Sequence, residues 1–77
     1  MNPYVLIVIA QMLSKGRVCK EELYQLSNYI PDAINLLSTV MKMDAQQLFE
    51  KMTKGEVKTN DIIVPFLTSI NDKYENL

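Results

Sequence analysis

The chain has 77 residues, with eight Lys or Arg, nine Asp or Glu and a formal net charge of −1. This length allows at most one small domain, and the charge argues against a nucleic-acid-binding module, which usually carries a strong basic excess. With one cysteine and no histidine, the chain can form neither an internal disulfide nor a Cys/His metal cluster. Its stability should therefore come from helix packing or from neighbouring segments.

The first predicted element starts near Pro3, ends at Gly16 and contains the apolar stretch YVLIVIA. Its β-branched residues favour a strand by propensity alone. We predict a helix instead, because the rest of the chain offers no partner strand. The stretch is much shorter than the roughly 20 apolar residues of a bilayer span, and no basic residue precedes it as in a signal peptide. We therefore expect no membrane contact in this segment.

A second helix is predicted after the sequence KGRV, with Cys19 or Lys20 at its N-cap. Pro31 is expected to end it, because the residue before a proline avoids the helical conformation. A short third helix then opens at Pro31 or Asp32. Helical spacing predicts the inward residues of these two helices: Leu23, Leu26, Ile30, Ala33, Ile34, Leu37, Val40 and Met41.

The spacing of Asp44 and Gln47 is that of a capping box, which predicts the start of a fourth helix that ends before Gly55. A fifth helix follows the sequence KGEV, capped by Thr59 or Asn60 and slightly kinked by Pro65. The apolar positions of these two helices are Ala45, Leu48, Phe49, Met52, Ile63, Phe66, Leu67, Ile70, Tyr74 and Leu77.

The chain contains the same corner twice, as Lys-Gly-x-Val at 15–18 and at 54–57. Gly16 and Gly55 are expected to end helices with positive φ, while Val18 and Val57 pack just after each turn. The distance between the two corners is that of helical repeats, which suggests an internal duplication. Unrelated segments that end and start helices with the same residue types would also explain much of the match, so both origins stay open. The sequence predicts an all-α fold, a small bundle of about five short helices built from two helix–Lys-Gly-x-Val–helix corners.

Candidate catalytic groups lack the partners that their chemistry needs. Glu21 and Glu22 are adjacent and therefore diverge around a helix, which predicts a role in the first turn near the positive end of the helix dipole. No acid lies within an apolar run, so nothing suggests a raised pKa. Cys19 and the serines have no histidine to act as a base. The two glycines are isolated, so there is no phosphate-binding loop. We predict no catalytic, cofactor or metal site, and give structural roles to Gly16, Val18, Pro31, Gly55, Val57 and Pro65.

The first helix carries apolar side chains all around, more than four short helices could enclose in so small a domain. Exposed apolar patches mark partner sites. We therefore expect an interface on this helix, with Tyr4, Ile7, Val8 and Met12 as its candidate residues and a homodimer as one outcome.

The order and spacing of these elements resemble the conserved helical domain near the N-terminus of phage and prophage tail tape measure proteins. The resemblance spans about residues 12–70. Two positions depart from that pattern, since Lys42 stands where the family has Gly and Cys19 where Ser or Thr is usual. The matching residues are Lys15, Gly16, Val18, Glu22, Leu23, Leu26, Pro31, Ala33, Leu48, Gly55, Val57, Asp61, Pro65 and Leu67.

The resemblance implies that residues 1–77 form one helical domain of a much longer tape measure protein that sets tail length. It implies no enzyme activity and no cofactor. The implied partners are tail tube and tip proteins, assembly chaperones or other parts of the same chain, in the host bacterial cytoplasm during assembly and then in the virion tail. The alternative is a stand-alone helical adaptor or regulatory protein with at most weak nucleic-acid binding.

Overall fold

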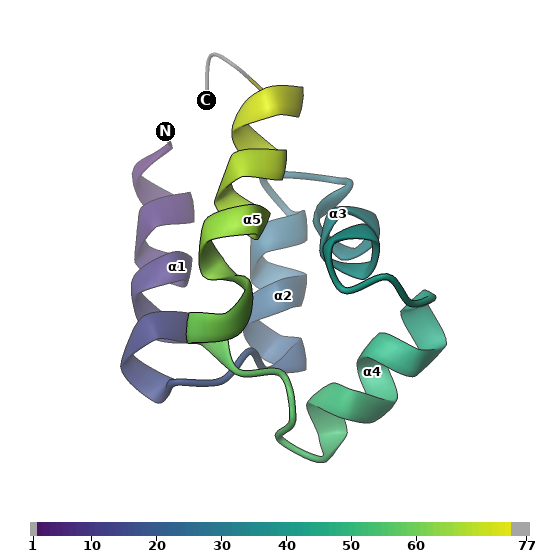
Figure 1. Ribbon diagram of the computed structural model, residues 1–77. Helices are drawn as coiled ribbons and strands as arrows, with labels where there is room; N and C mark the ends of the chain where they lie inside the picture. Colours follow the sequence, from purple (N-terminus) through teal and green to yellow (C-terminus); the bar gives the residue numbers. More distant parts are fainter. Residues whose placement is uncertain (1, 75–77) are drawn as a thin grey trace.

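Five α-helices follow one another in the computed structural model, which describes residues 2–74 (Figure 1). They are α1 (Pro3–Lys15), α2 (Lys20–Ser27), α3 (Ala33–Val40), α4 (Ala45–Thr53) and α5 (Thr59–Lys73). No strand is present in this part of the chain, so the predicted all-α bundle is confirmed. Leu77, predicted on the last helix, lies outside the described residues.

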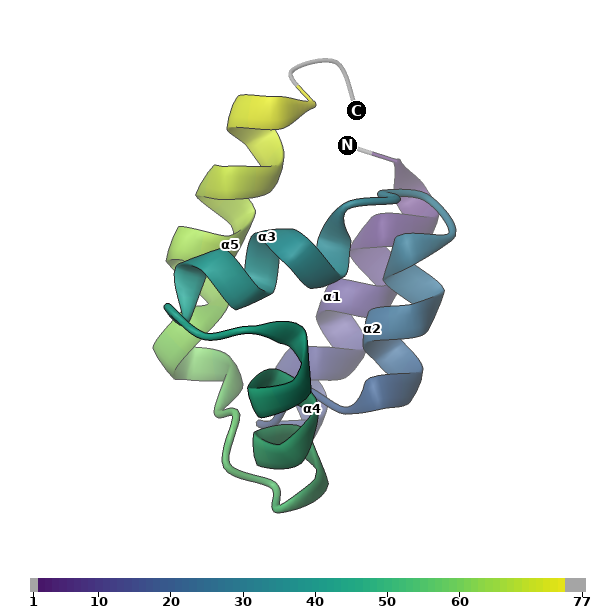
Figure 2. The ribbon, with the colours of Figure 1, turned by 90° about the vertical axis from the view of Figure 1, so that its right-hand side faces the viewer.

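Helix α1 packs against α2 and α5, and α3 packs across α2 and α5 (Figures 1 and 2). Helix α4 lies at the end of the bundle where the two Lys-Gly-x-Val corners meet, on the side away from α1. The start of α1 and the end of α5 lie together at the opposite end. This arrangement leaves one long side of α1 without a neighbouring helix.

The apolar first segment is helical, as predicted, despite its β-branched residues. Its start is well specified, because Pro3 occupies the first helical position and the Asn2 side chain accepts a 2.8 Å hydrogen bond from the Tyr4 N–H. One side of the helix packs in the core, which outweighs the weak preference of valine and isoleucine for strands.

The core is continuous and takes residues from all five helices and from both corners. The Cα radius of gyration is 11.3 Å, close to the roughly 11.5 Å expected for a folded domain of this length. The buried apolar residues are Val5, Val8, Ile9, Met12, Val18, Leu23, Leu26, Ile30, Ala33, Leu37, Leu48, Met52, Val57, Ile62, Phe66 and Ile70.

Left-handed residues end three of the helices. Gly16 follows α1 with φ 77°, and Gly55 follows α4 with φ 69°, as predicted. Lys42 takes the same conformation after α3, with φ 58°. Gly55 and Lys42 each form a Schellman motif, in which the N–H of the left-handed residue and that of the following residue donate to carbonyls of the preceding helix. The N–H groups of Gly55 and Glu56 donate to the Met52 and Lys51 carbonyls, and those of Lys42 and Met43 donate to the Thr39 and Ser38 carbonyls.

Two helix boundaries and one N-cap side chain differ from the prediction. Helix α2 ends at Ser27 rather than at Pro31, because the Asn28 and Tyr29 N–H groups bond three residues back and tighten the turn. Asp32 does occupy the N-cap of α3, but its side chain bonds Lys73 and Tyr74 of the α5 end instead of capping. Helix α5 has Lys58 as its N-cap, because the Thr59 hydroxyl is used elsewhere.

Candidate functional site

The two Lys-Gly-x-Val corners lie against each other as an antiparallel pair. The Val18 N–H donates a 2.9 Å hydrogen bond to the Val57 carbonyl, and the Thr59 N–H donates a 3.1 Å hydrogen bond to the Gly16 carbonyl. Arg17 and Lys58 form the isolated bridge between these bonds. Both valine side chains are fully buried. The repeated motif therefore builds one structural joint from two segments far apart in the sequence.

Thr59 extends this joint to the end of α1. Its buried hydroxyl donates a 2.7 Å hydrogen bond to the Met12 carbonyl, which also accepts from the Gly16 N–H. Carbonyls in the last turn of a helix have no intrahelical partner, so a donor from another helix stabilises that end. The first residue of α5 thus caps the last turn of α1.

Glu22 lies in the first turn of α2, as predicted, but the sequence analysis did not predict its burial. It is only 4% exposed, and its Oε2 accepts a 3.1 Å hydrogen bond from the half-exposed Lys15 ammonium. Its Oε1 is the one buried side-chain oxygen in residues 2–74 without a hydrogen-bond partner. The hydrogen bond to Glu22, and then the charge of Glu22, raise the pKa of Lys15. The i, i+4 spacing from Glu22 to the core residue Leu26 was the available signal.

An open cleft of about 480 Å³ lies beside the joint, between the α2 start and the α4 end. It is lined by Arg17, Cys19, Lys20, Glu21, Met52, Thr53, Lys54 and Gly55. Three cationic side chains and one carboxylate make it a candidate anion site. Cys19 is a free thiol and serves as the N-cap of α2 without a side-chain hydrogen bond.

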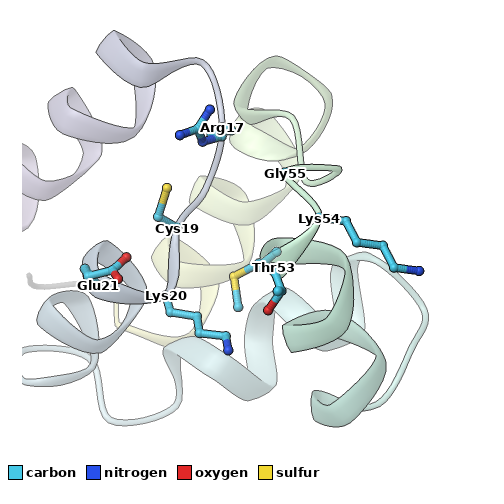
Figure 3. A pocket seen from close by; sticks show the side chains of 8 residues that line it. Arg17, Cys19, Lys20, Glu21, Thr53, Lys54 and Gly55 are labelled. Carbon is cyan, nitrogen blue, oxygen red and sulfur yellow. The ribbon is translucent and has the colours of Figure 1, made fainter.

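The cations of the cleft do not converge on one point (Figure 3). The Arg17 and Lys54 side chains extend in different directions, away from Lys20. The Lys20 ammonium is 5.8 Å from the centroid of the Phe49 ring and so is already in a cation–π contact. The cleft therefore lacks the clustered donors that hold a phosphate or carboxylate, and no base lies ready to activate Cys19, because the chain has no histidine.

The largest exposed apolar surface of a single helix is on α1. Tyr4 is 60% exposed, Leu6 53%, Ile7 54% and Leu13 50%. The Tyr4 ring stacks on that of Tyr29, with 5.6 Å between centroids, and so borders the surface on the α2 side. Large apolar side chains gathered in this way mark a contact surface more often than a chemical site.

The predicted interface residues separate into two groups. Tyr4 and Ile7 are exposed and belong to this surface. Val8 is 4% exposed and Met12 is fully buried, so placing these two at an interface was wrong. They lie on the side of α1 that faces the core, where they pack with the other buried residues. Leu6 and Leu13 take their place on the outer side.

The six predicted structural residues lie where helices start, turn or bend. Gly16, Val18, Gly55 and Val57 meet in the joint, while Pro31 and Pro65 are exposed and lie away from it, in the α2–α3 turn and within α5. No group of three potential metal ligands occurs in residues 2–74. Within the same residues, none of the helices combines the length and apolarity needed to cross a membrane.

Comparisons with protein-family models, curated proteins and solved structures found no match to this chain.

Proposed function

We propose that this chain is a non-enzymatic structural and assembly domain that acts through protein–protein contacts. The observation that carries the proposal is the exposure of four large apolar side chains on α1, three of which, Leu6, Ile7 and Leu13, lie on one side of the helix. Such a patch raises the free energy of the isolated domain in water, and a partner that covers it removes that cost. The cations of the cleft beside the joint extend in different directions, so they do not form the clustered donors of an anion site (Figure 3).

The finer proposal is that the domain belongs to a phage or prophage tail tape measure protein. It rests on the resemblance in sequence, and the joint adds support. Gly16, Val18, Gly55 and Val57 belong to the two motifs that carry the resemblance, and they form one paired unit here. The presence of two copies of the motif is explained if each copy needs the other to bury its valine side chain and to pair its backbone N–H and carbonyl groups.

In this role the domain contributes to tail assembly and length determination, in contact with tube, tip or chaperone proteins or with other parts of its own chain. It acts in the host bacterial cytoplasm and then in the virion tail. The test is the native open reading frame and the composition of purified tails. A frame of many hundreds of codons among tail genes, with peptides of this domain in the tails, is expected. A stop codon directly after Leu77 and tails that lack these peptides would refute the proposal.

The alternative function is that of a small adaptor with weak nucleic-acid binding. In this function the three cationic side chains of the cleft would contact the phosphates. A titration with duplex DNA at physiological salt separates the two functions. We expect at most weak, non-specific and salt-sensitive binding, because the net charge is −1. A dissociation constant below about 1 μM that rises when Arg17, Lys20 and Lys54 are replaced by glutamine would favour the alternative.

A further inference from the structure

The exposed side of α1 consists of Leu6, Ile7, Ala10, Leu13 and Ser14. These positions follow the spacing i, i+1, i+4, i+7 and i+8, which places them in one stripe along the helix. The stripe lies on the side of α1 that no other helix covers (Figures 1 and 2). Its centre is a small residue, so another helix could approach the α1 backbone closely there.

The stripe is symmetric about Ala10. Counting outward from Ala10, Ile7 and Leu13 are each three residues away, and Leu6 and Ser14 are each four away. Leu6 and Leu13 share one edge of the stripe and Ile7 and Ser14 share the other, because residues seven apart lie nearly above one another on a helix. An antiparallel copy of α1 with a two-fold axis through Ala10 therefore places Leu6 of one copy against Leu13 of the other, and Ile7 against Ser14. This is the self-complementarity that a two-fold symmetric interface requires.

The lack of charged residues in the stripe also favours a second copy of this helix as the partner that covers it. Residues 2–14 contain no Lys, Arg, Asp or Glu, so two copies of this face neither repel each other nor desolvate a charge. Antiparallel packing also places the positive end of each helix dipole near the negative end of the other. A partner with a charged face would lose its hydration here without gaining an opposite charge.

The available area sets the expected strength. Half-exposed side chains of this size each offer on the order of 100 Å², so the three large ones of the stripe, Leu6, Ile7 and Leu13, offer roughly 300 Å² before Ala10 and Ser14 are added. A stable pairwise interface buries about 600 Å² or more on each partner. Association should therefore be at the weak end of specific dimers, with a dissociation constant in the micromolar range.

We propose that two copies of this chain associate through α1, antiparallel, with the two-fold axis at Ala10. The inference rests on the proposed contact role of α1 and names the partner that fits it: a second copy. Sedimentation of the unmodified chain between about 1 and 300 μM should show a monomer–dimer equilibrium. A chain that remains monomeric at the upper end of this range overturns the dimer, and points to another occupant of α1. It leaves the open-reading-frame test of the assembly role untouched.

A reciprocal exchange of charges tests the register. Leu6→Lys and Leu13→Glu should each raise the dissociation constant at least about 100-fold, because each homodimer buries unpaired charges. An equimolar mixture of the two variants should restore dimers, since the ammonium introduced in one copy then faces the carboxylate introduced in the other. A mixture that stays monomeric overturns the proposed register. Circular dichroism establishes that both variants are folded, as expected for exposed positions.

Two controls distinguish disruption of the α1 interface from the effect of changing any exposed residue. Tyr24→Glu alters a comparably exposed apolar residue, but its ring stacks on Phe49 of α4, away from α1, so the dimer should persist. Dissociation by Tyr24→Glu equal to that by Leu6→Lys would overturn the α1 interface. In a Cys19→Ser background, Ala10→Cys should form a disulfide-linked dimer under mild oxidation much faster than Gln46→Cys on α4. Equal rates would overturn the placement of the axis.

Discussion

The backbone N–H of Val18 donates a 2.9 Å hydrogen bond to the carbonyl of Val57, so equivalent residues of the two repeated corners meet in the fold. Both side chains are fully buried at this contact. The pairing explains why a short chain contains the same corner twice. Each corner leaves backbone groups that its own helices cannot satisfy, and each supplies a partner for the other.

The hydroxyl of Thr59 should contribute to stability through this joint. Thr59→Val keeps the shape of the side chain but removes the 2.7 Å hydrogen bond to the Met12 carbonyl. The carbonyl keeps one donor, the Gly16 N–H, so we expect a loss of about 1 kcal/mol in the free energy of unfolding, measured by urea denaturation. Thr68→Val is the matched control, because its exposed hydroxyl bonds only the Val64 carbonyl of its own helix. Equal effects in the two variants would contradict this role.

Replacing Lys42 by glycine should stabilise the fold. Lys42 has φ 58°, a conformation that costs a side-chain-bearing residue about 1 kcal/mol. Lys42→Gly should therefore raise the melting temperature by roughly 4–8 °C, reduced somewhat by the greater freedom of glycine in the unfolded chain.

Replacing Gly55 by alanine is the opposite change, because it introduces a side chain at a left-handed residue, and it is compared with Lys42→Gly. A Cβ at Gly55 would meet only the Arg17 Cδ, at 3.9 Å, so Gly55→Ala should lose about 1 kcal/mol through backbone strain alone. Calorimetry of both variants measures these changes. A stabilising Gly55→Ala substitution would show that the left-handed turn is not strained there.

The Lys15–Glu22 pair should respond unequally to the loss of each partner. Lys15→Met leaves the buried Glu22 carboxylate without its cation and should destabilise the fold. Glu22→Gln should cost less, because the half-exposed Lys15 ammonium remains hydrated. The double variant should recover most of the stability lost in Lys15→Met. Additive losses in a double-mutant cycle would show that the two groups do not interact.

Acid should weaken the contact between the α3 start and the α5 end. The hydrogen bond from Lys73, and then its charge, hold the pKa of Asp32 below its ordinary value of 3.8. Because the folded-state pKa is the lower one, this stabilisation is present above pH 3.8 and is lost as the pH falls through the folded-state pKa.

Stability curves for the unmodified chain and for Asp32→Asn should therefore converge between about pH 4 and pH 2. Lys73→Gln serves as a second variant and should also converge with the unmodified chain, because it removes the same pair. A difference that stays constant from about pH 6 to pH 2 would show that Asp32 does not titrate against Lys73.

The sequence by itself determined that α2 to α5 are helical, because the signals involved are local, whereas α1 was predicted from the lack of a partner strand elsewhere in the chain. The Asp44–Gln47 capping box, the glycines at the helix ends and the apolar spacing each act within about one or two helical turns. For the same reason, nine of the inward residues that these patterns predicted lie in the core, and six more are partly buried against it. The nine are Leu23, Leu26, Ile30, Ala33, Leu37, Leu48, Met52, Phe66 and Ile70, and the six are Ile34, Met41, Phe49, Ile63, Leu67 and Tyr74.

Only the tertiary structure decided how distant side chains are used. Nothing local indicates that the Thr59 hydroxyl bonds α1 rather than capping α5, or that Asp32 bonds Lys73 rather than capping α3. The same holds for α1, whose sequence is apolar on every side. Val8 and Met12 became core residues and Ile7 an exposed one because neighbouring helices cover one side and leave the other open to water.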